Sequence, residues 1–201
     1  MTLLDNLAKQ YADTDLESIF TTVGIKSTKI DIARRQALKE VTLAQWLLES
    51  GRATSDLSTQ CFNFAGLKWR SGMTGFATPF LIKVSAEPVP VDFCKFNTVE
   101  EFIIGYWKFL TRAPYKGLED HTKTPEAFIG FLQRQGYAAD INYITKVLKL
   151  LPEAQQLLAA ASEGNISPAP RKLQILHAPT EVEVAQRFKV DEFPFLATRR
   201  A

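Results

Sequence analysis

Residues that bind metals or form disulfides are scarce in this sequence. It contains two cysteines and two histidines in 201 residues. Cys61 and Cys94 permit one disulfide at most, and their spacing relative to His121 and His177 matches no zinc-binding motif. The sequence therefore excludes a disulfide framework and a zinc module, and we expect no metal and no cofactor. It leaves open whether the two thiols are free and partly buried or form a single bridge.

An excess of charge of either sign and a long apolar run are also missing. The 24 lysines and arginines nearly balance the 22 aspartates and glutamates, which leaves a net charge of +2 and no general signature of nucleic-acid binding. No apolar run approaches the roughly 20 residues that span a bilayer. Acidic side chains interrupt the N-terminal segment, unlike a secretory signal. We therefore expect a chain that is cytoplasmic as synthesised, leaves the cell by another route or has lost a signal.

Size and composition are those of a globular protein. Hydrophobic residues make up 46% and charged residues 23% of the sequence. We predict an N-terminal helical extension over residues 1–29, a main domain over residues 30–162, and a linker with a C-terminal tail over residues 163–201. About 30 residues of tail are too few for a separate core. Residues 165–201 are thus a candidate docking segment for a protein partner.

Hydrophobic periodicity predicts a mostly helical α+β fold. Apolar residues at helical spacing predict helices over residues 3–22 (one or two), 30–50, 98–110, 125–136, 140–150 and 153–162, and a short helical turn is expected at 55–60. We expect Asp140 to cap the helix that follows it. Residues 80–85 and 89–95 predict two strands joined near Glu87 and Pro88, and the prolines favour an edge position or a short irregular hairpin.

The segment over residues 41–68 is the most informative part of the chain. It begins as a helix that is apolar over most of its circumference and carries one carboxylate, Glu49, near its C-terminal end. Two interpretations follow. Either Gly51 ends the helix and Glu49 points to water, or Glu49 opens into a cleft where desolvation raises its affinity for a proton.

Several separated motifs resemble one known family. In chain order they are AQWLLESG, NFAGLKW, FCKF, GYWKFL, RAPYKG and GYAADINYITKVL. This series, over about residues 30–150, resembles the glucosaminidase family of bacterial cell-wall hydrolases, which cleave the β-1,4 bond on the reducing side of N-acetylglucosamine in peptidoglycan. The resemblance implies a lysozyme-like helical lobe with a small β-hairpin lobe flanking the cleft. It also implies an endo-β-N-acetylglucosaminidase that acts on peptidoglycan glycan strands at the cell wall.

The resemblance assigns roles to individual residues. Glu49 matches the catalytic acid, and Tyr137 matches the tyrosine that faces the catalytic cleft. Trp69 is added because its ring suits stacking on a sugar face. The full set of implied substrate-binding residues is Asn63, Phe64, Lys68, Trp69, Phe96, Asp140 and Tyr143.

The second catalytic group is left open. The family's second acidic residue lies in the hairpin, where Glu87 fits by spacing, 38 positions after Glu49 (87 − 49), and Asp92 is an alternative. A carboxylate about 6.5–9.5 Å from the acid would activate water and invert the anomeric centre. Alternatively, the N-acetyl group of the substrate assists the reaction with Tyr137 orienting it, and no second carboxylate is needed.

The sequence departs from the family pattern at three places. The usual ESGWG is ESGRA, so that Arg52 replaces an aromatic residue, the usual Phe-Gly is Phe64-Ala65-Gly66, and the hairpin is short and rich in proline. These departures leave an alternative function, a non-catalytic glycan-binding or assembly module of a phage tail or injection apparatus. A phage tail or an injection apparatus would also deliver an enzyme that lacks a signal peptide.

Overall fold

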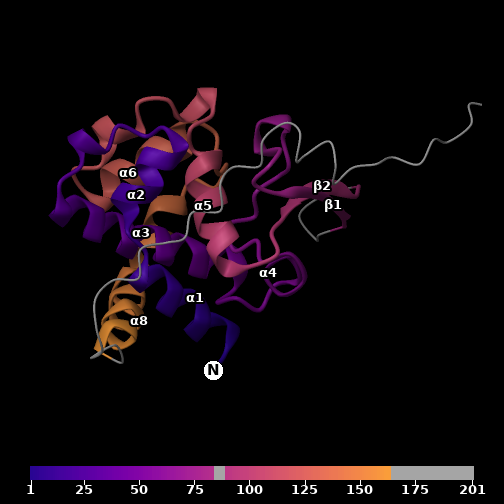
Figure 1. Ribbon diagram of the computed structural model, residues 1–201, viewed down its shortest axis with the longest axis horizontal. Coiled ribbons are helices and arrows are strands. Elements are labelled where there is room, and N and C mark those ends of the chain that lie inside the picture. Colours follow the sequence, from indigo (N-terminus) through magenta and orange to yellow (C-terminus); the bar gives the residue numbers. More distant parts are fainter. Residues whose placement is uncertain (84–88, 164–201) are drawn as a thin grey trace, which may run out of the picture.

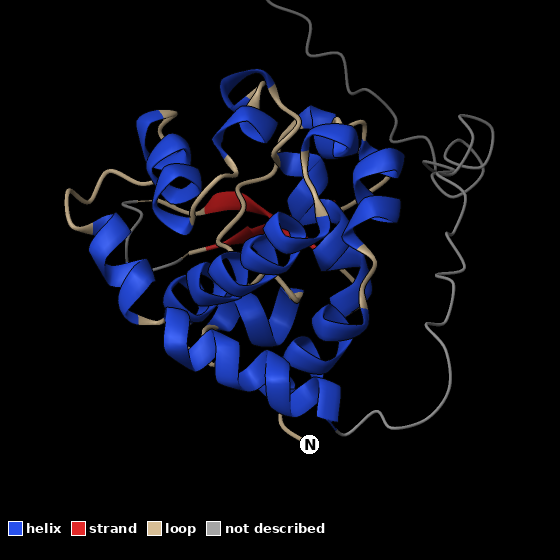
Figure 2. Ribbon diagram, turned by 90° about the vertical axis from the view of Figure 1, so that its left-hand side faces the viewer, coloured by secondary structure: helices blue, strands red, loops and turns tan. Residues whose placement is uncertain are grey.

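The computed structural model describes residues 1–83 and 89–163, and these residues confirm the predicted mostly helical α+β class (Figures 1 and 2). The described strands form one two-stranded antiparallel sheet. The elements are α1 (Leu3–Asp13), α2 (Leu16–Val23), η1 (Ser27–Lys29), α3 (Ile32–Ser50), α4 (Asp56–Cys61), η2 (Ser71–Met73), β1 (Thr78–Ile82), β2 (Val91–Lys95), α5 (Val99–Phe109), η3 (Ala113–Tyr115), η4 (Leu118–His121), α6 (Pro125–Arg134), α7 (Tyr143–Lys149) and α8 (Leu151–Glu163).

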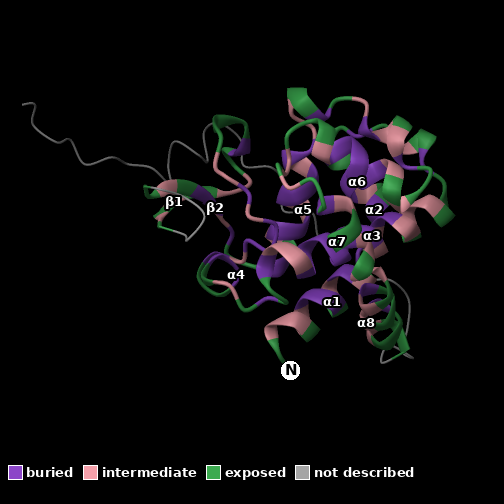
Figure 3. Cartoon of the chain, turned by 180° about the vertical axis from the view of Figure 1, so that it is seen from behind, coloured by how far each residue is buried: buried purple, intermediate pink, exposed green. Residues whose placement is uncertain are grey.

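Helix α3 lies at the centre of the helical part and contacts α1, α6, α7 and α8. Its start is fixed by Asp31, whose side chain accepts a hydrogen bond from the backbone N–H of Arg34 at 2.9 Å. Its end is fixed by Gly51, which adopts the left-handed conformation with φ of 57°. Between these ends most residues of α3 after Leu38 are buried (Figure 3). The sequence thus predicted this helix to within two residues at its start.

An aromatic cluster around Trp46 joins the helices into one core. The Trp46 ring lies 4.4 Å from the Tyr11 ring of α1, 4.8 Å from Phe102 and 5.0 Å from Tyr106, both on α5. Such tilted and edge-to-face contacts stabilise a core beyond the area that they bury. Because α1 contributes Tyr11 to this cluster, the N-terminal helices share the core of the predicted main domain.

The hairpin lies on the side of α5 away from the other helices, next to α4 (Figure 1). Its register pairs Thr78 with Lys95 and Ile82 with Val91. Strand β1 begins two residues earlier than predicted and includes Pro79, which a two-stranded sheet tolerates because both strands are edges. The predicted turn at Glu87 lies outside the described residues.

The prediction that Asp140 caps a helix is wrong. Helix α7 begins at Tyr143 with Asn142 at the N-cap position, which makes no side-chain capping bond. Asp140 instead accepts a hydrogen bond from the backbone N–H of Asn142 at 2.9 Å and pairs with Lys146. An aspartate that bonds two residues ahead forms a turn of its own, so the helix starts only after that turn.

Two other features of the described residues bear on the sequence predictions. No helix among them combines the length and the apolar character that crossing a bilayer requires. Cys61 and Cys94 are both free and buried, and burial raises the pKa of the Cys94 thiol to about 12. The thiols therefore act as small packing groups.

Gly105 of α5 should not tolerate a side chain. A Cβ atom there would lie 2.3 Å from Cε1 of the buried Phe96 ring. We expect Gly105→Ala to lower the free energy of unfolding by about 2 kcal/mol, because overpacking at a rigid ring outweighs the gain in helix propensity. Urea unfolding measures this, with Gly72→Ala as the control, since no atom lies within 4 Å of that Cβ. Equal effects of the two substitutions would contradict the packing.

Candidate active site

Glu49 lies in the last turn of α3 and is half-buried. Its Oε1 atom accepts a hydrogen bond from the Tyr143 hydroxyl at 2.7 Å. Burial raises the pKa of the Glu49 carboxyl above the ordinary value of 4.5, and the Tyr143 hydrogen bond opposes part of that rise. Gly51 ends the helix, and the Glu49 carboxyl does not point to open water, because it is half-buried and partly desolvated.

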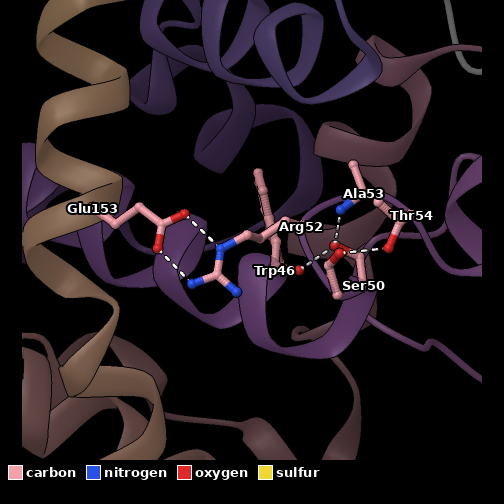
Figure 4. Close-up of polar contacts among 7 residues, drawn as sticks. Trp46, Ser50, Arg52, Ala53, Thr54 and Glu153 are labelled. Atoms are coloured by element: carbon pink, nitrogen blue, oxygen red, sulfur yellow. Dashed lines mark hydrogen bonds and ion pairs between the residues drawn. The ribbon is translucent and has the colours of Figure 1, made fainter.

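The chain turns sharply after Glu49, and local bonds lock this turn (Figure 4). Gly51, Arg52 and Ala53 all adopt positive φ angles of 57°, 58° and 63°. The Ser50 hydroxyl donates to the Trp46 carbonyl at 2.6 Å and accepts from the Ala53 N–H at 2.8 Å. The two bonds satisfy backbone groups at the helix end, so they fix where α3 stops and where Glu49 lies.

Arg52, which stands where the family pattern has an aromatic residue, forms a two-pronged ion pair with Glu153 of α8 (Figure 4). Its Nε and one terminal nitrogen each lie 2.7 Å from a different carboxylate oxygen. This geometry is the one that guanidinium and carboxylate groups match best. Arg52 therefore links the C-terminal end of α3 to α8.

Asn63 holds a second turn next to Glu49. Its buried side chain donates to the carbonyls of Leu67 and Cys94 and accepts from the Leu67 N–H, each at 2.9 Å. In this turn Gly66 has φ of +60°, and a Cβ atom there would lie 3.9 Å from Glu49 Oε2. Both hydrogens of the Asn63 amide are thus bonded to backbone carbonyls, and the amide shapes the turn that passes the acid.

Tyr137 connects that turn to the helices. Its hydroxyl donates to the Ala65 carbonyl at 2.9 Å, and its ring lies 6.3 Å from the Tyr143 ring and 6.2 Å from the Tyr115 ring. Burial raises the pKa of the Tyr137 hydroxyl well above 10, so the group stays protonated. The structure therefore brings Glu49, the Gly66 turn, Tyr137 and Tyr143 together.

Two aromatic residues expected to bind substrate have their side chains in the hydrophobic core. Phe64 and Phe96 are 0% exposed and pack against Phe102 at 5.0 and 5.6 Å. Their burial leaves no ring face for a sugar, so we no longer assign them to substrate binding. An aromatic residue in a motif signals core packing as readily as stacking on a ligand.

Of the remaining expected residues, Lys68, Trp69 and Asp92 border the hairpin, and Asp140 lies just before α7. Lys68 and Trp69 are half-buried beside β2, where Lys68 forms a backbone β-bridge with Phe93 and the backbone N–H of Trp69 donates to the Asp92 backbone carbonyl at 2.9 Å. Asp92 is exposed on β2. Glu87 lies outside the described residues. The part of the chain that the structure describes holds no group of three or more metal-binding side chains.

Sequence reasoning missed Gln45 and Tyr106. Both are fully buried, and a hydrogen bond of 2.5 Å joins the Tyr106 hydroxyl to Gln45 Oε1. Gln45 in turn donates to the Tyr143 hydroxyl at 2.9 Å. The signal for Gln45 was present in the sequence, since it is a polar residue one helical turn before Glu49 within an apolar helix. Nothing in the local pattern around Tyr106 distinguishes it from its aromatic neighbours.

Solved structures and one family match this chain. The peptidoglycan hydrolase from Sphingomonas sp. A1 is 19% identical over 83% of this chain and 99% of that chain, with a TM-score of 0.52. The glycoside hydrolase domain of FlgJ from Salmonella typhimurium is 22% identical over 75% and 95%, with a TM-score of 0.48. The catalytic domain of the autolysin Auto from Listeria monocytogenes is 18% identical over 79% and 88%, with a TM-score of 0.48. No curated protein matches the sequence.

The match to the Sphingomonas structure shows that the fold is shared, and this chain has the predicted lysozyme-like helical lobe with a small hairpin. The glucosaminidase family, described as mannosyl-glycoprotein endo-beta-N-acetylglucosaminidase, matches residues 29–156. That match spans more than half of the chain, and the protein therefore belongs to the glucosaminidase family of glycoside hydrolases.

Asn63→Ala should destabilise the protein. The substitution removes three buried hydrogen bonds and leaves backbone groups unsatisfied, which costs about 2–4 kcal/mol. Urea unfolding checks this, with Asn97→Ala as a control because Asn97 is exposed. Unchanged stability with a raised KM would instead mean that Asn63 contacts the substrate directly.

Glu49→Gln should raise the thermal midpoint at neutral pH. Since the folded-state pKa of Glu49 is raised, the folded protein binds the proton more tightly than the unfolded chain does, and ionisation lowers stability as the pH rises above 4.5. The glutamine is neutral throughout and avoids this loss. Thermal unfolding between about pH 4 and about pH 8 should show an advantage of the variant that grows with pH. An advantage independent of pH would contradict the raised pKa.

Proposed function

We propose that this protein hydrolyses the glycan strands of peptidoglycan as an endo-β-N-acetylglucosaminidase, with Glu49 as the general acid. The observation that carries the proposal is the half-buried Glu49 carboxyl, whose pKa burial raises, at the point where α3 meets the Gly66 turn. Membership of the glucosaminidase family supports the reaction class. The name of one structural neighbour, a peptidoglycan hydrolase, supports the substrate.

The chemistry requires a proton for the departing glycosidic oxygen and stabilisation of an oxocarbenium-like centre. A carboxyl group whose pKa is raised still carries its proton where a free glutamate has lost it, which is the state that a general acid needs. After the proton leaves, the carboxylate keeps the hydrogen bond from Tyr143. The same contact therefore suits Glu49 before and after the transfer.

The second half of the reaction has two routes. Glu87 or Asp92 would activate a water molecule, or the N-acetyl group of the substrate would attack while Tyr137 orients it. The Tyr137 hydroxyl donates its hydrogen to the Ala65 carbonyl, so the lone pairs of its oxygen are left to accept the amide N–H of an N-acetyl group. This orientation of the Tyr137 hydroxyl supports the route without a second carboxylate.

The substrate sets the place of action, which we infer to be the cell wall. Delivery by a phage or injection machine, with residues 165–201 docking on a protein partner, completes this proposal. The tail lies outside the described residues, and the docking role comes from its length and composition.

Glu49→Gln tests the proposal. We expect peptidoglycan clearing to slow at least about 100-fold, the contribution typical of a general acid, while sedimentation with insoluble peptidoglycan is retained. Glu40→Gln makes the same chemical change earlier on α3, where Glu40 accepts hydrogen bonds from the Gln36 and Gln155 side chains, and should clear like the wild type. Clearing that survives in Glu49→Gln removes Glu49 from the mechanism.

The bond that is cut is identified by mass spectrometry of the reduced digest. New reducing ends on N-acetylglucosamine are expected. Reducing ends on N-acetylmuramic acid would make the enzyme a muramidase and would contradict the proposed specificity while leaving the role of Glu49 intact.

A further inference from the structure

Glu49 stands at the end of a buried chain of hydrogen bonds that crosses three helices. The Tyr106 hydroxyl of α5 donates to Gln45 Oε1 of α3 at 2.5 Å. Gln45 Nε2 donates to the Tyr143 hydroxyl of α7 at 2.9 Å, and Tyr143 donates to Glu49 Oε1 at 2.7 Å. Gln45 and Tyr106 are both 0% exposed, so solvent does not replace either partner.

The amide of Gln45 sets the donor-to-acceptor direction of this series of hydrogen bonds. A glutamine amide has one end that only accepts hydrogen bonds and one that only donates them. With Tyr106 donating to Oε1, the Nε2 group faces Tyr143 and fills one lone pair of its oxygen. The single hydrogen of Tyr143 is then left for Glu49. An amide turned by half a rotation would take that hydrogen itself, and Glu49 would lose its donor.

The direction of the chain determines which oxygen of Glu49 carries the acid proton. Oε1 accepts from Tyr143, and in a neutral carboxyl group the oxygen that accepts is the carbonyl oxygen, so the proton resides on Oε2. That oxygen lies toward Gly66, which has no side chain to cover it. The tyrosines do not supply protons themselves, because burial raises the pKa of Tyr106 and of Tyr143 and keeps both hydroxyls neutral.

We propose that Gln45 is a positioning residue for the reaction, whose buried amide, oriented by Tyr106, aims the Tyr143 hydroxyl at Glu49 Oε1 and so keeps the transferable proton on Oε2 beside Gly66. The inference rests on the proposed role of Glu49 as general acid. It adds that a side chain that acts on Glu49 through the Tyr143 hydroxyl decides how effectively the acid works.

The structure supplies a matched control on the same helix. Thr42 is also 0% exposed and also bonds a buried tyrosine hydroxyl, that of Tyr11, at 2.6 Å. In the described chain Thr42 and Tyr11 bond to each other and are not hydrogen-bonded to Glu49 or Tyr143. A variant at Thr42 therefore reports what losing a buried polar contact of α3 does to the fold alone.

The titratable groups coupled to Glu49 in the described residues are Tyr143 from α7, Tyr106 from α5 and Tyr137 from the loop after α6. All three stay neutral because burial raises their pKa values. The pKa of Glu49 thus responds to its own burial and to the Tyr143 hydrogen bond, which lowers it. Losing the aimed hydroxyl should therefore raise the pKa of Glu49.

The experiment compares Gln45→Leu, Tyr106→Phe and Thr42→Val with the wild type. For Gln45→Leu we expect kcat to fall roughly 10- to 100-fold, the loss typical of a misplaced reacting group, with KM unchanged. The basic limb of the kcat–pH profile should move to higher pH, and ¹³C NMR titration of the Glu49 carboxyl should move with it. Tyr106→Phe should change both readouts in the same direction but less, and Thr42→Val should change neither.

The proposal is overturned if Gln45→Leu keeps the wild-type kcat and titration, or if Thr42→Val shifts them equally. Should Gln45→Leu fail to fold, Tyr106→Phe decides by the same measurements, since it keeps the ring and removes only the hydroxyl. Failure of the underlying function is distinguishable. An active Glu49→Gln refutes the acid itself, whereas an inactive Glu49→Gln beside an unaltered Gln45→Leu refutes only the positioning role.

Discussion

The arrangement of the site depends on one carboxyl group, that of Glu49, which is half-buried and accepts a hydrogen bond from Tyr143. Burial alone favours the neutral form of Glu49, and the Tyr143 hydroxyl limits that preference by also stabilising the anion. A carboxyl group whose pKa is raised holds its proton at higher pH than a free glutamate does, which suits proton donation. The C-terminal end of α3, the Gly66 turn and the start of α7 meet at this carboxyl group.

Two neighbouring anchors keep the surroundings of Glu49 fixed. Asn63 binds the turn to β2 through its amide, and Arg52 binds the end of α3 to α8 through Glu153. Arg52 departs from the family pattern, and its side chain links two helices. Tyr143 and Gly66 remain the neighbours of the Glu49 carboxyl. Family membership and an unusual sequence at the helix end are therefore compatible.

Much of the fold was predictable from local pattern. Helical periodicity located α3, α5 and α6 to within about two residues at most of their ends. The side chains of Asp31 and Thr98 accept backbone N–H bonds at the starts of α3 and α5, as N-cap residues commonly do. The start of α7 was not predictable from local pattern. The Asp140 side chain accepts a hydrogen bond from the Asn142 backbone N–H, and the helix begins only after this turn. Competition between a cap and a turn depends on the course of the chain, which the sequence pattern does not encode.

By itself, the sequence determined the helices, the hairpin, the family and Glu49 as the acid to examine, because spacing and residue type carry that information. Only tertiary structure decided the surroundings of Glu49. Tyr106 comes from 57 positions further along the chain (106 − 49) and reaches the acid through Gln45 and Tyr143. Burial likewise made Phe64 a core residue and occupied the Asn63 amide with backbone groups. Desolvation and long-range hydrogen bonds arise when distant segments pack, and no local pattern specifies them.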